Sequence, residues 1–438
     1  MNNEQTTSPN YKWIALLLLW VAFFLQQGTR QVFSATLTSI QGALGVSSAQ
    51  IGLVVTVFTF AYGLSVPFAG MAADLLNRKW MVVSGVFVFC TGIFVSGFVS
   101  ALGLLIVTYG LLNGFGQSFY YPSATSIIGQ LHKETRATAL SILQMGLYAG
   151  IIGCSAAAGF LAESGTDGWR TAFYAFGGLG IAWAVALAFL LKDTRLSGTA
   201  GAPLPRTDEV PPPRGSGAPA ASKPKATPKE ALAVFVANPS AVMLAVGLGM
   251  MIYVDVGFKT WMPNHLQEVF GLDKGPAALN AVLWHYLGAF VGVTLGGRLS
   301  DRFVSRRPSV RMETNILGLA CAVPFIVWMA HAQSLTVCCA AMALFGVFRG
   351  VYDSNLMASL FDLIPSRYHA SGAGIMLCFG FVFGSTSPVV LGFLKERFSS
   401  SAGLTSLAGF YLVGAVVILV ARYCAFGRST GNDRLRLD

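Results

Sequence analysis

The chain alternates long apolar runs with short polar segments, and the length of the runs predicts the architecture. Twelve apolar runs lie near residues 13–40, 51–72, 80–99, 104–130, 138–161, 171–191, 241–266, 277–298, 313–331, 335–363, 372–394 and 404–424. A helix needs about 20 mostly apolar residues to cross a bilayer. No run alternates strictly with period two, and open strands would leave backbone polar groups unpaired in lipid. The pattern therefore predicts an all-α membrane protein with twelve transmembrane helices.

The composition agrees with a membrane protein and excludes other classes. Only 11% of the 438 residues are charged and 54% are hydrophobic, whereas a soluble domain carries about 25% charged residues. Soluble, disordered and nucleic-acid-binding proteins are thereby excluded. The net charge of +10 requires no nucleic acid, because Lys and Arg concentrate in the cytoplasmic loops of membrane proteins.

The positions of Lys and Arg predict the orientation. Basic residues gather after the second, fourth, eighth and tenth runs and in the central segment, and none follows the first, third or ninth run. By the positive-inside rule, both termini and the central segment are cytoplasmic. We expect a multi-pass protein of the plasma membrane, in a bacterium the inner membrane.

One long polar stretch divides the chain into six runs and six. Residues 193–229 are rich in Pro, Gly, Ala and Ser, a composition typical of a flexible linker. An amphipathic piece at 229–237 precedes the seventh run. The expected domains are a cytoplasmic tail (1–12), a six-helix bundle (13–192), a cytoplasmic linker (193–237), a second six-helix bundle (238–425) and a cytoplasmic tail (426–438).

The two halves repeat each other. The same spacing of 227 residues separates Gly70 from Gly297 and Asp74 from Asp301, and each pair follows the second run of its half. A parallel repeat joined by a linker predicts two bundles related by pseudo-two-fold symmetry, with a site between them near the middle of the membrane.

The repeated segment carries a family resemblance that covers the chain except for its tails and linker. Gly70-x-x-x-Asp74-x-x-x-Arg78-Lys79, with its copy Gly297, Asp301 and Arg302, resembles the loop signature of the major facilitator superfamily of secondary transporters. The resemblance implies that these residues form a cytoplasmic latch that favours the outward-open state. Asn77 stands where the family usually has Gly, and Asn tolerates a left-handed turn. Positive-inside anchoring is the alternative role of Arg78 and Lys79.

Arg30 is the first ionisable residue inside a run. Charged groups within spans are costly and mark a pathway or a buried pair. Arg30 follows a polar stretch of Gln, Gly and Thr, and a guanidinium suits bidentate capture of carboxylate or phosphate. With Tyr62 and Gly63, the pattern resembles two branches of the superfamily, the organophosphate:phosphate antiporters and the anion:cation symporters, whose span-one Arg holds the substrate anion. A structural Arg that reaches outward or pairs with Asp255 is the alternative.

Asp255 occupies the matching place in the seventh run. In the organophosphate antiporters, the position that resembles Asp255 is a second Arg that helps to hold phosphate. This chain has an acid there instead, which argues against a phosphate-specific site. Asp255 either binds a substrate amine, carries the coupling proton or forms an ion pair with Arg30. Lys259 stands at i+4 and is a further partner for Asp255 or a substrate contact.

Two later runs add candidates for proton coupling. His285 titrates near physiological pH, although a lone helical His also serves in packing. Arg349 and Asp353, at i and i+4, predict an intramembrane ion pair, and Asp353 is alternatively a proton carrier. The coupling candidates are therefore Asp255, His285 and Asp353. Substrate contacts, with packing as the alternative, are expected from Tyr62, Tyr120, Tyr121, Trp284, Tyr352 and Asn355.

Other chemistry finds no support in the residues. The seven cysteines lie in or beside apolar runs without a Cys-x-x-Cys pair or paired His, which predicts packing rather than a metal site or disulfides. The sequence holds no Gly-x-x-x-x-Gly-Lys-Ser/Thr loop for nucleotide phosphates. We expect no cofactor, no metal and no enzymatic activity.

The sequence thus predicts a monomeric carrier that rocks two bundles around Arg30 and Asp255. Its expected substrate is a small organic anion, a carboxylate such as a sugar acid or a zwitterion, moved with a proton or a counter-solute. Three alternatives remain open: an organophosphate:phosphate exchanger, an exporter of an amphipathic compound, and a membrane sensor that transports nothing. The fifth run lacks the Gly-Pro pair typical of drug:proton exporters, so export is favoured less than uptake of an anion.

Overall fold

The chain is almost entirely helical. The structure, a computed structural model, describes residues 10–132, 135–165, 167–192, 228–304, 309–365 and 368–425. No strand occurs among these residues. Twelve helices of the described part are long and apolar enough to cross a membrane, which confirms the predicted fold class.

The first bundle, called here the N-half, contains six spans. They are α1 (Tyr11–Leu44), α2 (Ser48–Leu75), α3 (Arg78–Ser96), a composite fourth span, α7 (Arg136–Ala162) and α8 (Gly168–Leu190). The fourth span joins α4 (Leu102–Leu105), a π-helical segment (Ile106–Asn113), α5 (Gly114–Ser118) and α6 (Tyr120–Leu131). Wide π-turns inside a helix change which face its later residues present. Here the π-helical segment ends at the polar residue Asn113 and precedes Gln117.

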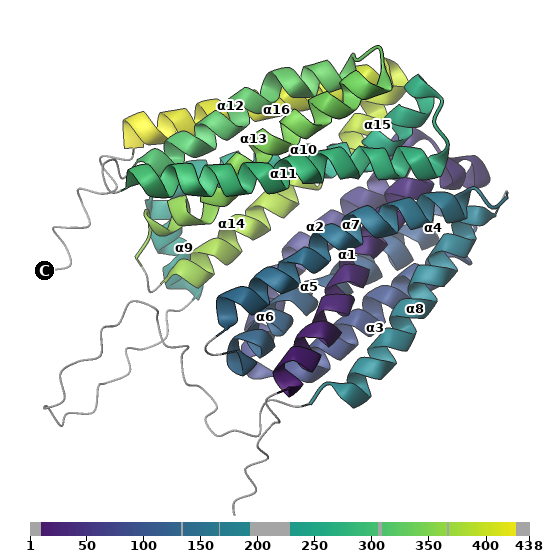
Figure 1. Ribbon diagram of the computed structural model, residues 1–438, viewed down its shortest axis with the longest axis horizontal. Helices are drawn as coiled ribbons and strands as arrows, with labels where there is room; N and C mark the ends of the chain where they lie inside the picture. The colour runs from purple at the N-terminus through teal and green to yellow at the C-terminus, as the bar shows by residue number, and fades with distance from the viewer. Residues whose placement is uncertain are drawn as a thin grey trace, which may run out of the picture.

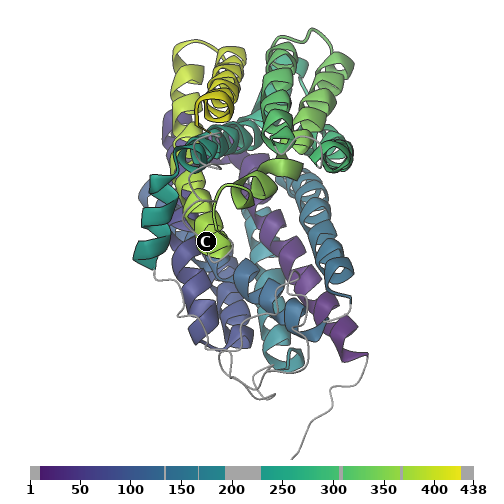
Figure 2. The ribbon, with the colours of Figure 1, turned by 90° about the vertical axis from the view of Figure 1, so that its left-hand side faces the viewer.

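The second bundle, called here the C-half, has the same organisation. Its spans are α10 (Pro239–Phe270), α11 (Lys274–Val304), α12 (Val310–Ala330), α13 (Leu335–Phe361), a span built from α14 (His369–Gly384) and α15 (Ser387–Arg397), and α16 (Ser400–Val420), which a π-helical segment (Ala421–Ala425) extends. The C-half lies over the N-half in both views (Figures 1 and 2).

The first helix of each half ends in the same way, at a glycine. Gly45 ends α1 with φ 62° and Gly271 ends α10 with φ 64°, a left-handed conformation that Gly adopts without strain. Asn77, in contrast, has φ −72° and accepts a hydrogen bond from the backbone N–H of Lys79. Asn77 therefore does not use the left-handed conformation that Asn tolerates, because it is the N-cap of α3 and an N-cap takes extended geometry.

The linker ends in a short helix. Residues 193–227 and both tails, 1–9 and 426–438, lie outside the described residues. The expected amphipathic piece is helical, α9 (Pro228–Ala237), and buries Ala231 and Phe235. Phe235 lies close to Gly372 of α14, so α9 packs on the C-half.

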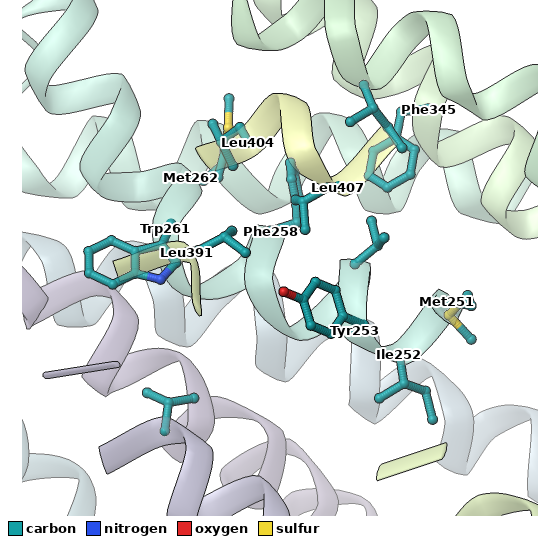
Figure 3. Close-up of a cluster of buried hydrophobic side chains, with 14 of the residues drawn as sticks. Met251, Ile252, Tyr253, Phe258, Trp261, Met262, Phe345, Leu391, Leu404 and Leu407 are labelled. Carbon is teal, nitrogen blue, oxygen red and sulfur yellow. The ribbon is translucent and has the colours of Figure 1, made fainter. Parts of the chain in front are cut away.

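The core of the C-half surrounds α10. Phe258 and Trp261 of α10 lie among buried side chains of α13, α15 and α16, including Phe345, Leu391 and Leu407 (Figure 3). The most apolar stretch of α10 is 72% buried, the largest share of any span in the described chain. A charged side chain on the inner part of this helix therefore needs partners within the protein.

The halves are joined at one end. We call the end from which α8 runs toward α9 the linker end, and the opposite one the far end. The bundles converge near α15 and α4 and separate toward α9 and α6 (Figure 1). Five hydrogen bonds between described residues cross the seam: Thr38–Gln267, Ala49–Glu396, Ser155–Ala278, Ala162–Lys274 and Glu163–Gly275. All five lie in the far-end parts of their helices.

Candidate functional site

Arg30 of α1 is held by a polar network inside the N-half. Its Nε donates to Oε1 of Gln117 at 2.5 Å. The amide nitrogen of Gln117 donates in turn to Asn113 at 2.9 Å and to Thr29 at 3.3 Å. Gln26 donates to the backbone carbonyl of Gln117 at 2.7 Å. This set, the Arg30 cluster, holds Nε of the guanidinium and leaves the edge that carries Nη2 without a hydrogen-bond acceptor among the described residues.

The free edge of Arg30 is framed by aromatic rings. The guanidinium carbon lies 4.4 Å from the ring centroid of Tyr62 and 5.5 Å from that of Phe58. Stacking on aromatic faces stabilises a cation without neutralising it. Nη2 of Arg30 is buried and has no hydrogen-bond acceptor in the part of the chain that the structure describes. A buried donor without an acceptor is costly, and an anionic ligand would remove that cost.

The second group of charges, called the Asp255 cluster, lies in the C-half. Oδ2 of Asp255 is 2.5 Å from Nζ of Lys259, and Oδ1 is 3.1 Å from Nη2 of Arg349. The same Nη2 lies 3.6 Å from Asp353. Nη1 of Arg349 lies 3.2 Å from Nε2 of His285. Helices α10, α11 and α13 thus contribute two acids, two bases and one imidazole to a single cluster.

Burial explains why these charges gather. Asp255 is only 9% exposed and His285 is fully buried, with the rings of Phe258 and Phe345 beside the imidazole. A carboxylate is stable out of water only where cations surround it. Asp353 is the less engaged of the two acids, because its side chain is 30% exposed and its one ion pair with a described residue is the long one to Arg349.

Arg30 and Arg349 each lie beside a tyrosine ring that contacts the other half of the protein. Tyr62, which stacks on Arg30, contacts Phe381 of the C-half with 5.0 Å between ring centroids. Tyr286, 5.8 Å from Arg349, contacts Tyr148 of the N-half at 5.8 Å. The Arg30 cluster and the Asp255 cluster therefore adjoin the same interface from opposite sides.

Arg30 and Asp255 form no ion pair in this state. Each has other partners: Gln117 and two rings for Arg30, Lys259 and Arg349 for Asp255. The sequence left an ion pair between the halves open as one alternative, and the structure instead pairs Asp255 with Lys259 and Arg349 within the C-half.

The remaining predicted contact residues are distributed over the molecule. Tyr120 is buried in the N-half core, donates to the carbonyl of Leu19 and stacks on Phe23. Tyr121 is 43% exposed and also lies beside Phe23. Trp284 is 38% exposed and donates to Asn280 at 2.9 Å.

Two predicted residues of α13 point into the C-half. Tyr352 is fully buried, and its hydroxyl has no partner among the described residues. Asn355 is 1% exposed and donates to the carbonyl of Gly296 on α11 at 3.3 Å. Of the contacts predicted besides Arg30 and Asp255, Tyr62 lies against Arg30 and Lys259 belongs to the Asp255 cluster.

The repeated loop motif lies at the linker end. A Cβ placed on Gly70 or Gly297 would meet no atom within 4 Å, so neither glycine is in close helix contact in this state. Lys79 lies over the ring of Trp80 at 5.2 Å. Asp301 and Arg302 are exposed near the end of α11. The side chain of Asp74 lies outside the described part, and Arg78 begins α3.

Sequence reasoning missed the role of Gln117. This amide of the fourth span positions Arg30 and ties it to Asn113 and Thr29. The signal was present, since a buried Gln in an apolar run needs hydrogen-bond partners.

No group of three or more potential metal ligands gathers among the described residues, and the described cysteines are free thiols.

Comparisons with known proteins identify the family. A family model described as Major Facilitator Superfamily matches residues 19–388. The "Probable sulfoacetate transporter SauU" of Cupriavidus necator is 27% identical over 416 residues, 92% of this chain and 92% of that protein. The glycerol-3-phosphate transporter of Bacillus subtilis is 24% identical, over 85% of this chain and 84% of that protein.

A sugar-acid transporter and a solved structure are also similar. The D-galactonate transporter of Escherichia coli is 23% identical, over 92% of this chain and 94% of that protein. The crystal structure of a bacterial homologue of the human lysosomal transporter Spinster, inward-facing and unoccupied, superposes with a TM-score of 0.82. It is 20% identical and the match covers 97% of this chain and 99% of that one, a likeness that shows the fold.

Proposed function

Because the chain belongs to the major facilitator superfamily, we propose that it is a secondary transporter that carries a small organic anion across the plasma membrane. The substrate class we propose is a carboxylate such as a sugar acid. Each chain contains both halves and both clusters, so we propose that it works as a monomer.

The charge inventory of the two clusters carries this proposal. In the Asp255 cluster, the two acids Asp255 and Asp353 balance the two bases Lys259 and Arg349. Of the cations in the two clusters, Arg30 is the one that no carboxylate of the described chain contacts within ion-pair distance. This uncompensated positive charge favours an anionic ligand, and its free Nη edge suits a carboxylate.

We propose that transport is driven by a proton and that Asp353 is its first carrier, ahead of Asp255 and His285. Asp353 is partly exposed and has one long ion pair, whereas Asp255 contacts two cations and His285 is enclosed by rings. A weakly paired carboxylate accepts a proton at lower cost than one held by two cations.

The proposed orientation has the linker end in the cytoplasm. The positive-inside distribution of Lys and Arg supports it. In that orientation the far-end hydrogen bonds close the external face. The repeated loop motif would then meet its partners when the linker ends approach each other in the opposite state.

Exchange of an organophosphate for phosphate is the second candidate. The position of Arg349 favours this exchange. Its guanidinium lies 3.1 Å from Asp255, so the C-half has an arginine beside the position where the sequence alone showed only an acid. Arg30 and Arg349 together would suit a phosphate dianion. Counterflow of inorganic phosphate against glycerol 3-phosphate separates the two candidates.

Binding tests the substrate class. Purified protein in detergent is heated with D-galactonate, sulfoacetate, glycerol 3-phosphate, phosphate, amino acids and cationic drugs. A ligand at a hundred times its dissociation constant stabilises the folded state by about 2.7 kcal/mol. We expect an organic anion to raise the unfolding temperature of the parent protein and of Arg170→Gln, but not that of Arg30→Gln. Arg170 is the control because it binds the carbonyls of Gly97 and Val99 within the N-half. A shift with cationic drugs alone, equal in Arg30→Gln, would contradict the proposal.

A further inference from the structure

A second repeated motif occurs at the far end. Residues 159–163 read Gly-Phe-Leu-Ala-Glu and residues 392–396 read Gly-Phe-Leu-Lys-Glu, 233 residues apart. The first ends α7 in the N-half and the second ends α15 in the C-half. The two copies occupy equivalent places in the fifth and eleventh spans.

Each copy places its glutamate on a helix start of the other half. Oε1 of Glu163 accepts a hydrogen bond from the backbone N–H of Gly275 at 2.7 Å, in the first turn of α11. Oε1 of Glu396 accepts one from the backbone N–H of Ala49 at 2.7 Å, in the first turn of α2. The first N–H groups of a helix lack intrahelical acceptors, and the positive end of the helix dipole favours a carboxylate there.

Each copy also places its glycine at a close approach within the same contact. A Cβ on Gly159 would lie 2.7 Å from Cα of Gly275, and one on Gly392 would lie 2.9 Å from Cα of Ala49. Neither distance is possible for real atoms without movement. The glycine thus allows the close approach that brings the glutamate, one helical turn later, within reach of the same partner residue.

Both glutamates are exposed, so these contacts can separate without burying a charge. Glu163 lines a surface cavity of about 450 Å³ together with Gln267, Asp273 and Lys274. Lys274 adds a hydrogen bond to the carbonyl of Ala162 at 3.2 Å. Contacts that water can replace are suited to breaking and forming in each transport cycle.

We propose that the repeated Gly-Phe-Leu-x-Glu motif forms two symmetry-related latches that hold the far end closed. Glu163 and Glu396 are positioning residues: they set the balance between the two access states and do not contact the substrate. The inference rests on the proposed function only in assuming that the far end opens during the transport cycle.

The test uses a buried thiol as a reporter of opening. Ser155 of α7 is 1% exposed and donates across the seam to the carbonyl of Ala278 on α11 at 2.9 Å. In a Ser155→Cys background, purified full-length protein in detergent reacts with a thiol-specific reagent. Reaction of the natural cysteines is measured on the parent chain and subtracted. No substrate is needed, so the outcome is independent of the substrate proposal.

We expect the reaction of the thiol introduced by Ser155→Cys to accelerate when the latches are removed. Glu163→Ala and Glu396→Ala should each raise the rate by about tenfold, because a hydrogen bond to a charged group of this kind changes an equilibrium by about that factor. Glu163→Gln and Glu396→Gln should show smaller increases, because the amide oxygen still accepts the N–H bond without the charge. These conservative variants also keep the test valid if an alanine variant fails to fold.

Asp167→Ala is the matched control. Asp167 lies at the same end and pairs with Arg170 at 3.2 Å, but both residues belong to the N-half and lie outside both copies of the motif. The Asp167→Ala variant should react at the parent rate. The proposal is overturned if the alanine and glutamine variants of Glu163 and Glu396 all react at the parent rate, or if Asp167→Ala accelerates the reaction as much as they do.

Discussion

Asp255 and Arg349 form an ion pair of 3.1 Å between α10 and α13, inside one half of the transporter. With Lys259 at 2.5 Å on its other oxygen, the carboxylate is neutralised without any contribution from the N-half. Arg30, across the seam, is therefore not needed to balance the charge of Asp255.

Removing Asp255 should destabilise the fold. Asp255→Ala leaves Lys259 and Arg349 buried with one fewer anion, and breaking such a pair costs about 3–5 kcal/mol. Thermal unfolding in detergent measures this loss. The double variant Asp255→Leu/Lys259→Met removes both charges and should regain at least half of it. Equal instability of the single and double variants would contradict the cluster as described.

Gln117 should control the affinity for the anion. Gln117→Leu removes the acceptor that orients Nε of Arg30, so we expect KM for the transported anion to rise by about tenfold, the size of one charge-assisted hydrogen bond, while the maximal rate changes less. Gln41→Leu is the control, because Gln41 bonds to Ser48 near the far end. Equal KM values in the two variants would exclude this positioning role.

Asp353 should separate exchange from proton-driven uptake. Asp353→Asn removes the proposed proton carrier and keeps the side-chain shape, so exchange of external for internal substrate should continue and uptake driven by a pH gradient should stop. Asp362→Asn is the control, because Asp362 binds Arg311 near the linker end at 2.9 Å. Proton-driven uptake that survives in Asp353→Asn would transfer the role to Asp255 or His285.

The tight crossing of α11 and α13 should be essential for the Asp255 cluster. A Cβ on Gly350 would overlap the carbonyl oxygen of Ala289, so Gly350→Ala must separate the helices that carry His285 and Arg349. We expect a loss of about 1–3 kcal/mol and reduced transport. In Gly409→Ala the new methyl meets no atom within 4 Å, and stability should be unchanged or slightly higher. Equal stability of the two variants would contradict the crossing.

The sequence predicted the spans, the two halves and the family resemblance because each follows from local pattern: run length, charge placement and repeats. The family match over residues 19–388 confirms the resemblance. Arg30 could be singled out for the same reason, since a polar stretch inside an apolar run is visible without a structure.

The partners of Asp255 could not be chosen from the sequence. Lys259 was a candidate at i+4, but Arg349 is 94 residues away, and its proximity depends on how α13 crosses α10 and α11. Gln117 likewise lies 87 residues from Arg30 in the chain, and their contact depends on how the fourth span packs beside α1. The Gly-Phe-Leu-x-Glu repeat, in contrast, is visible in the sequence, and only its partners required the structure.

Uptake into proteoliposomes tests the central claim most directly. The protein is reconstituted, and accumulation of D-galactonate, sulfoacetate and other labelled organic anions is followed under an inward proton gradient in the parent, Arg30→Gln and Arg170→Gln. We expect the parent and Arg170→Gln to accumulate at least one of these anions and Arg30→Gln to accumulate none. Accumulation that is equal in Arg30→Gln, or no movement of any organic anion by the folded parent protein, would contradict an anion transporter built around Arg30.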